Sequence, residues 1–176
     1  MRSKEMRRGH TVPFFVEIKE YMISKDIVNQ LIEDYLTGSD FYLVDLVLTP
    51  DQRISIEIDA WKGVSIEDCV QLNRYLVERL SPAIEDYEVE VSSAGITEPF
   101  KVLRQYQKNI GKEVEVLTRE GKKLTGILTE ATPEVFTLKA EKKVKEEGSR
   151  RKTIVEELLT FNYTAIKTTK MIIRFK

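Results

Sequence analysis

Apolar residues recur with a helical period in two stretches of the first half of the chain. In the first stretch, 24–36, they form one stripe that follows Ser24, a candidate N-cap, and ends before Gly38. The second stretch begins at Ser65 with the order Ser-x-x-acid and ends where Ser81 meets a proline. We therefore predict two amphipathic helices, each with one buried face.

Strand-like patterns lie between and after these helices. Residues 41–48 are a short apolar run, residues 54–59 alternate isoleucine with polar residues, and Val89 and Val91 alternate with glutamates. The order is helix, strand, strand, helix, strand. Two helices can cover one face of such a three-stranded sheet while its other face meets water, so we predict an α-β-β-α-β domain.

The second half of the chain has a different pattern. A short helix is expected over about 101–109, and short strand-like runs follow at 114–118, 124–130, 135–140, 153–159 and about 165–175. Short strands separated by turn signals are typical of a small β-barrel. The almost wholly charged segment 141–152 is expected to be an exposed hairpin tip or loop. The predicted fold class is therefore α+β.

The distribution of charge divides the chain at the same place. The formal net charge is only −1, but residues 22–96 hold 5 basic and 15 acidic residues, whereas 97–176 hold 18 basic and 11 acidic residues. The sign changes within the stretch VSSAGITEPF, 91–100. We predict an acidic domain over 22–96, a basic domain over 97–176, and a flexible extension over 1–21.

No catalytic or metal site emerges from the residue types. A nucleophilic Ser92 or Ser93 would need a base, and the one histidine, His10, lies in the predicted extension. The alternative, that these hydroxyls shape a turn, is favoured. A single cysteine, Cys69, with one histidine cannot build a structural zinc site. We predict no enzyme activity, no cofactor and no metal, and a hydrolase is the least favoured class.

Location can also be predicted from what the sequence lacks. No apolar run approaches the length of about 18 residues that crosses a bilayer, and no signal-peptide core is present. The single cysteine excludes an internal disulfide. We expect a cytoplasmic protein without membrane contact.

Charged side chains provide the remaining candidate sites. Basic residues on a small β-barrel can contact RNA phosphates, although an ordinary solvated surface is the alternative. The candidates are Lys101, Arg104, Lys122, Lys123, Arg150, Arg151 and Lys152. Acidic residues of the first half could bind a basic protein, with a solvated sheet edge as the alternative. Those candidates are Asp45, Glu57, Asp59, Glu67 and Asp68.

Several segments together resemble one known family. FYLVDLVL (41–48), ISIEIDAWKGVSIEDCVQLNRYL (54–76), YEVEVSSAGITEPF (87–100) and YQKNIGKEVEV (106–116) are similar, in order, to the RimP-type ribosome maturation factors. The similarity covers about 24–176. It implies an α/β domain followed by an SH3-like or Sm-like barrel. It also implies a non-enzymatic role in assembly of the small (30S) ribosomal subunit, with contacts to a ribosomal protein and to rRNA.

Some positions match this family and others depart from it. Ser92, Ser93 and Gly95 match its boundary motif, whereas Ala94 stands where many members have proline. Thr97-Glu98 replaces the usual Asp-Arg pair, so the contacts of that arginine do not carry over. Residues 1–21 lie outside the similarity, which leads to the hypothesis that translation starts at Met22.

These observations predict binding at two points. The acidic residues would contact a ribosomal protein and the basic residues rRNA, because two weak linked contacts raise the effective affinity. The expected partner is the immature small subunit, with no small-molecule substrate, and the chain is expected to be a monomer. A free Sm-like RNA-binding regulator, which would act as a ring, is the alternative.

Overall fold

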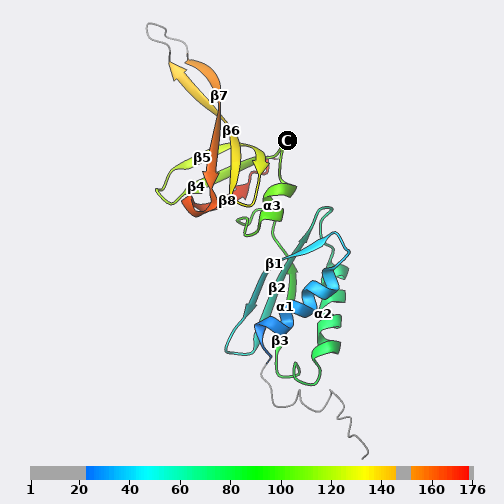
Figure 1. Cartoon of the computed structure of the whole chain (residues 1–176). Helices are drawn as coiled ribbons and strands as arrows, with labels where there is room; N and C mark the ends of the chain where they lie inside the picture. Colours follow the sequence, from blue (N-terminus) through cyan, green and yellow to red (C-terminus); the bar gives the residue numbers. More distant parts are fainter. Residues whose placement is uncertain (1–22, 146–151, 175–176) are drawn as a thin grey trace, which may run out of the picture.

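The computed structural model describes residues 23–145 and 152–174 and is an α+β fold (Figure 1). Its described part holds three α-helices and two β-sheets. The predicted extension, 1–21, lies outside the described residues. The elements are α1 Lys25–Leu36, β1 Phe41–Leu48, β2 Arg53–Ala60, α2 Ile66–Leu80, β3 Glu88–Ser93, α3 Leu103–Lys108, β4 Glu113–Thr118, β5 Lys123–Ala131, β6 Val135–Lys145, β7 Lys152–Asn162, the 3-10 helix η3 Tyr163–Ala165 and β8 Ile166–Met171.

The first two helices begin where their caps predict. The Ser24 hydroxyl accepts a hydrogen bond from the Ile27 amide at 3.3 Å at the start of α1. At the start of α2, Ser65 and Asp68 form a reciprocal capping box. Each helix buries three apolar residues spaced about one turn apart: Val28, Ile32 and Leu36 in α1, and Leu72, Leu76 and Leu80 in α2. Both predicted helices are confirmed.

The first sheet has the strand order β1-β2-β3, and α1 and α2 lie on one of its faces (Figure 1). The alternation in β2 sends Ile54, Ile56 and Ile58 into the core with these helices. The residues between them therefore point to the helix-free face. A register shift in β1 between Leu43 and Asp45 pairs Asp45 with Glu57, so it brings that carboxylate to the same face.

The second sheet has the order β7-β6-β5-β4-β8, with antiparallel neighbours throughout. The expected small barrel is not closed in the residues that the structure describes, because β7 and β8 are opposite edges with no ladder between them. Strand-like sequence runs predict strands but not the tilt and stagger that closure requires.

The strands β6 and β7 also extend further than predicted. They pair as far as Lys145 and Lys152 and form a ribbon that projects from the sheet (Figure 1). Part of the charged segment expected to be an exposed hairpin tip or loop, 141–145, is therefore strand. A continuous backbone ladder pairs the two strands along this ribbon. Residues 146–151 lie outside the described residues.

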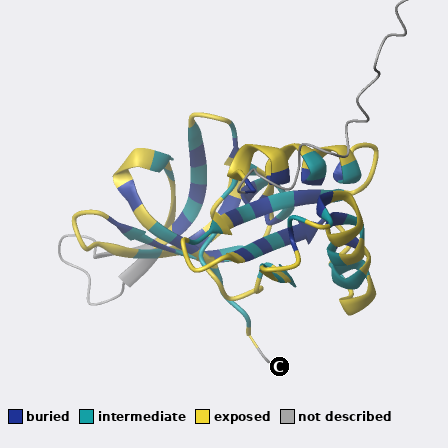
Figure 2. Cartoon of the chain, turned by 90° about the horizontal axis from the view of Figure 1, so that it is seen from below, coloured by how far each residue is buried: buried dark blue, intermediate teal, exposed yellow. Residues whose placement is uncertain are grey.

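Each sheet has its own apolar core (Figure 2). The second core is centred on Phe136 and includes Tyr106 of α3. The Tyr106 ring lies 5.1 Å from Phe100, 5.0 Å from Phe136 and 5.1 Å from Tyr163, measured between ring centroids. No buried residue belongs to both cores.

A short segment joins the two sheets. The Ala94 amide donates to the Ile58 carbonyl of the first sheet at 2.9 Å, and the Phe100 amide donates to the Thr169 carbonyl of the second at 2.8 Å. Only residues 95–99 lie between these two hydrogen bonds. The stretch 91–100, where the charge changes sign, therefore links one sheet to the other.

Candidate functional site

Three of the acidic candidates lie together on the helix-free face of the first sheet. Asp45 of β1 is paired in register with Glu57 of β2, and Asp59 follows two residues later on the same face. Each of these three carboxylates is paired with a basic side chain. Basic side chains of the segment 101–108 contact all three.

Lys101 bridges the first two carboxylates. Its Nζ lies 2.8 Å from Asp45 Oδ2 and 2.8 Å from Glu57 Oε2. The Lys101 backbone amide donates to the buried side chain of Gln105 at 2.7 Å. This hydrogen bond fixes the backbone of Lys101 to α3, which packs against the second core. The hydrogen bonds to Asp45 and Glu57 raise the pKa of Lys101. The same lysine lowers the pKa of Asp45.

Asp59 has a more buried set of partners. Its Oδ1 accepts from Lys108 Nζ at 2.7 Å and from the Ala60 amide at 2.8 Å, and its Oδ2 accepts from the Tyr42 hydroxyl at 2.7 Å. The side chains of Lys108 and Asp59 are 19% and 12% exposed. Burial, and then the hydrogen bond to Asp59, raises the pKa of Tyr42. The phenol therefore stays a donor.

Arg104 completes the basic side of this contact. Its guanidinium carbon lies 5.6 Å from the centroid of the Tyr42 ring. Lys101, Arg104 and Lys108 thus all face the first sheet. We name this set of residues the interdomain ionic cluster: Asp45, Glu57, Asp59, Lys101, Lys108, Tyr42 and Arg104.

The acidic candidates of α2 lie elsewhere, at its N-terminus. The Asp68 carboxylate accepts from the amide and the hydroxyl of Ser65 at 2.7 and 2.6 Å, and these hydrogen bonds lower the pKa of Asp68. Asp68 therefore has a structural role as a cap. Glu67 is exposed, and its one hydrogen bond among the described residues is from the Gln71 side-chain amide at 3.5 Å, so its carboxylate is accessible to a partner.

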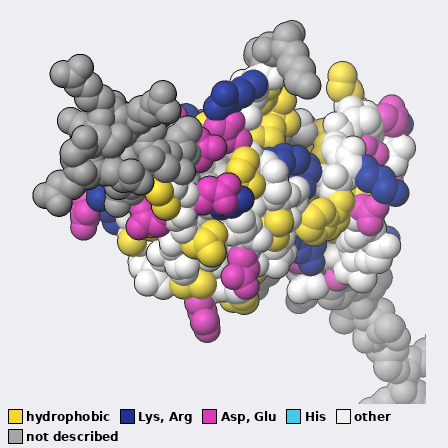
Figure 3. Space-filling model, turned by 90° about the horizontal axis from the view of Figure 1, so that it is seen from above, with side chains coloured by type: hydrophobic (Ala, Val, Ile, Leu, Met, Phe, Trp, Pro, Cys, Tyr) yellow, Lys and Arg dark blue, Asp and Glu magenta, His cyan; other side chains and the backbone are white. Residues whose placement is uncertain are grey.

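The basic candidates outside the cluster are spread over the second sheet. Lys123 pairs with Glu115 at 2.8 Å. Lys122 is exposed and has no ion-pair partner among the described residues. Lys152 opens β7, and its side chain is not described, while Arg150 and Arg151 lie outside the described residues. Figure 3 shows that basic and acidic side chains intermingle on one face of the molecule.

The hydroxyls of the joint do not form a nucleophilic arrangement in the described structure. Ser92 is half-buried and donates to the Ile56 carbonyl at 3.5 Å, and Ser93 is exposed at the end of β3. Cys69 is half-buried on α2, and burial raises the pKa of its thiol. Within the described residues no group of three or more metal-ligating side chains comes together.

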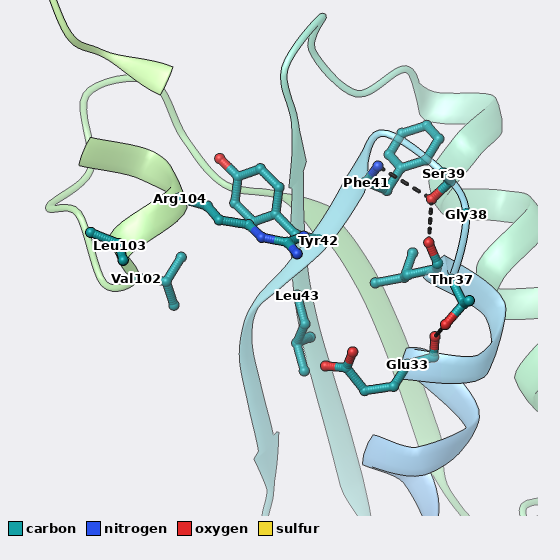
Figure 4. Close-up of a pocket in the computed structure, with 11 residues that line it drawn as sticks. Glu33, Thr37, Gly38, Ser39, Phe41, Tyr42, Leu43, Val102, Leu103 and Arg104 are labelled. Carbon is teal, nitrogen blue, oxygen red and sulfur yellow. Dashed lines mark hydrogen bonds between the residues drawn. The ribbon is translucent and has the colours of Figure 1, made fainter. Parts of the chain in front are cut away.

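A groove runs beside the ionic cluster, between the end of α1, the start of β1 and the start of α3 (Figure 4). Its volume is about 630 Å³, and Tyr42 and Arg104 line it. A second hollow of about 310 Å³ continues over Phe100, Tyr106 and Tyr163. Val102 and Leu103 belong to both. These hollows flank the contact between the two sheets.

Comparison with known proteins identifies the family. The model of the RimP N-terminal domain matches residues 31–97. The ribosome maturation factor RimP of Porphyromonas gingivalis (strain W83) is 38% identical over 152 residues, which are 86% of this chain and 100% of that protein. The chain belongs to the RimP family. RimP of Christiangramia forsetii is 31% identical over 152 residues, 86% of this chain and 99% of its own length. RimP of Flavobacterium psychrophilum is 30% identical over 156 residues, 88% of this chain and 100% of its own length.

The RimP match divides the ionic cluster. The matched residues, 31–97, include the three carboxylates, and they end before Lys101 and Lys108. Sequence reasoning found the acidic and basic residues separately but missed Tyr42, since an aromatic residue in an apolar strand gave no polar signal. No helix among the described residues is long and apolar enough to cross a membrane.

Proposed function

We propose that this protein is a non-enzymatic, cytoplasmic factor required for assembly of the small (30S) ribosomal subunit. It binds the immature particle through a ribosomal protein and through rRNA. The observation that carries this proposal is the 38% identity, over 86% of the chain, to a protein named ribosome maturation factor RimP. Relatives with the same name at 31% and 30% identity support it.

The division of charge supports binding at two points. The part that is built on the first core, 22–96, is acidic, and the part that is built on the second core, 97–176, is basic. We assign these parts as two domains, the second an open sheet related to the SH3-like barrel. A basic ribosomal protein fits the first surface and phosphates fit the second.

Exposed residues outside the ionic cluster are the best candidates for these contacts. Glu67 offers an accessible carboxylate at the start of α2, and Lys122 offers an accessible ammonium before β5. The candidate Lys152 begins β7 of the projecting β6–β7 ribbon, and the candidates Arg150 and Arg151 lie outside the described residues. The paired residues remain candidates for external contacts only when their ion pairs within the chain are broken. These residues are Asp45, Glu57, Asp59 and Lys101.

Gradient sedimentation of a lysate tests the proposal. We expect the protein to migrate with free small subunits and to be absent from translating ribosomes. A protein that stays at the top of the gradient at low salt would contradict the ribosomal role. The mass of the purified protein in solution should be that of a monomer, since an Sm-like regulator would form a ring.

Charge-reversal variants then test the two surfaces. Glu67→Lys and Lys122→Glu should each weaken binding to purified immature small subunits, because each reverses an exposed charge of the proposed contacts. Glu78→Lys on α2 is the matched control for Glu67→Lys, and Lys170→Glu on β8 is the matched control for Lys122→Glu. Both control residues are exposed, and each substitution changes the net charge by the same amount as its test variant. Equal binding by the test and control variants would contradict the assignment of these surfaces.

A further inference from the structure

The contact between the two cores is polar rather than apolar. The cores share no buried residue, and residues 95–99 are the only chain between the last hydrogen bond of Ala94 to the first sheet and the first hydrogen bond of Phe100 to the second. Among the residues that the structure describes, the hydrogen bonds across the contact are those of Lys101 and Lys108 to three carboxylates. Interfaces of this polar kind permit relative motion of the parts they join.

The carboxylates and the lysines of this contact are each fixed by further contacts within their own half of the molecule. The carboxylates stand on neighbouring strands of the first sheet, and Asp59 is fixed further by Tyr42 and the Ala60 amide. Lys101 is held by Gln105, and Lys108 ends a helix whose Tyr106 is buried in the second core. Breaking the ion pairs would therefore release one sheet from the other without disturbing either core.

We propose that Lys101 and Lys108 form an ionic latch on Asp45, Glu57 and Asp59, and that the two sheets separate about residues 95–99 when this latch opens. The Lys101 pairs carry side chains that are 37–39% exposed. Pairs so exposed are weak and sensitive to salt, which makes the latch reversible. The Lys108–Asp59 pair is less exposed and sets the geometry in which the latch closes.

Opening changes what the molecule presents to a partner. In the closed form, Asp45 and Glu57 are both paired with Lys101, and the Val102–Leu103 segment lies between two hollows. In the open form, these carboxylates and Lys101 all become available for external charges. The latch thus controls how much of the acidic and basic surface is exposed.

Energy transfer between two dyes tests the latch on the full chain. Cysteines are placed at the exposed positions Glu78 of α2 and Thr125 of β5, in a Cys69→Ser background. We expect efficient transfer at about 20 mM salt and a loss of transfer at about 1 M salt, where the screening length falls to roughly 3 Å. Lys101→Glu should lower the closed-to-open equilibrium constant about tenfold already at low salt.

A charge swap separates the latch from a general loss of structure. Combining Lys101→Glu with Asp45→Lys and Glu57→Lys should restore transfer at low salt. Lys123→Glu, which breaks the Lys123–Glu115 pair inside the second sheet, should leave transfer at the wild-type value. Far-UV circular dichroism checks that each variant is folded. If the Lys101→Glu variant does not fold, Lys101→Ala takes its place in the experiment.

Two results would overturn the latch. One is transfer that changes neither with salt nor with the loss of the Lys101 charge. The other is a charge-swapped variant that stays open. The experiment contains no ribosome, so its outcome is independent of the proposed role in subunit assembly.

Discussion

Gly126 is the position where one added methyl group should do the most damage to the second sheet. It is buried in β5, opposite Val114 of β4. A Cβ built on Gly126 would lie 2.6 Å from the Lys139 carbonyl oxygen, 3.1 Å from its carbonyl carbon and 3.2 Å from the Ala140 Cα. All three atoms belong to the backbone of β6, so no side-chain rotation can relieve the clash.

The cost of Gly126→Ala can be worked out from these distances. Ordinary contact begins at 3.4 Å, so β5 and β6 would have to separate by roughly 0.8 Å locally. Overpacking of this kind costs about 1–3 kcal/mol. Alanine recovers about 0.5–1 kcal/mol because it lowers the entropy of the unfolded chain. The central values of these two ranges leave a net loss of about 1 kcal/mol, or a fall of roughly 4–8 °C in Tm for a domain of this size.

Thermal unfolding monitored by circular dichroism measures this loss, and Gly95→Ala is its control. A Cβ at Gly95 would meet only the Glu98 side chain, with its Cγ at 2.9 Å, and that chain can rotate away. We expect Gly95→Ala to stay within about 0.5 kcal/mol of the wild type. A Gly126→Ala variant that melts within about 2 °C of the wild type would refute the close approach of β5 to β6.

Three further predictions use other parts of the molecule. Ser65→Ala removes the capping box of α2 and should cost about 1 kcal/mol in urea unfolding, and an unchanged midpoint would contradict this role. The latch should stay closed across neutral pH. Lys101 holds the pKa of Asp45 below its usual 3.8, so the contribution of Asp45 is present above 3.8 and is lost as the pH falls through the lowered value. Energy transfer that drops already at pH 6 would therefore argue against Asp45 as the latch carboxylate. Lys122→Ala should reduce the slope of log K against log salt by about 0.7–0.9 for a fluorescent RNA oligonucleotide, and an unchanged slope would exclude a phosphate contact there.

The helices and strands of the first half could be predicted because their signals are local. The Ser65 capping box, the stripe of α2 and the alternation of isoleucines in β2 each act within a few residues. The isoleucine alternation also predicted which face of the sheet is buried. The direction of the carboxylates between those isoleucines followed from the same period.

The interdomain ionic cluster could not be predicted in this way. Lys101 lies 56 residues from Asp45 and 44 from Glu57, and Lys108 lies 49 from Asp59. Nothing in a local pattern indicates which distant charge a lysine will meet. Lys101 and Arg104 were predicted as candidates for RNA contact, whereas the structure turns both toward the first sheet beside Lys108.

The second sheet marks the other limit of sequence reasoning. Short strands were found where the apolar runs are, but their arrangement as an open sheet depends on tilt and stagger between strands. The ribbon of β6 and β7 is held by backbone hydrogen bonds through a segment of charged side chains. Its side-chain pattern therefore resembles that of a loop.

The internal pairing of opposite charges changes what the division of charge means for binding. Oppositely charged segments joined by residues 95–99 are at high effective concentration for each other. Asp45, Glu57 and Lys101 are consequently paired inside the chain before any partner arrives. On the proposed role in subunit assembly, the particle engages these residues by replacing both halves of the latch at once, with cations on one side and phosphates on the other. A partner that offers a single charge would leave the latch closed, so the requirement for two simultaneous contacts favours a particle that contains both protein and RNA.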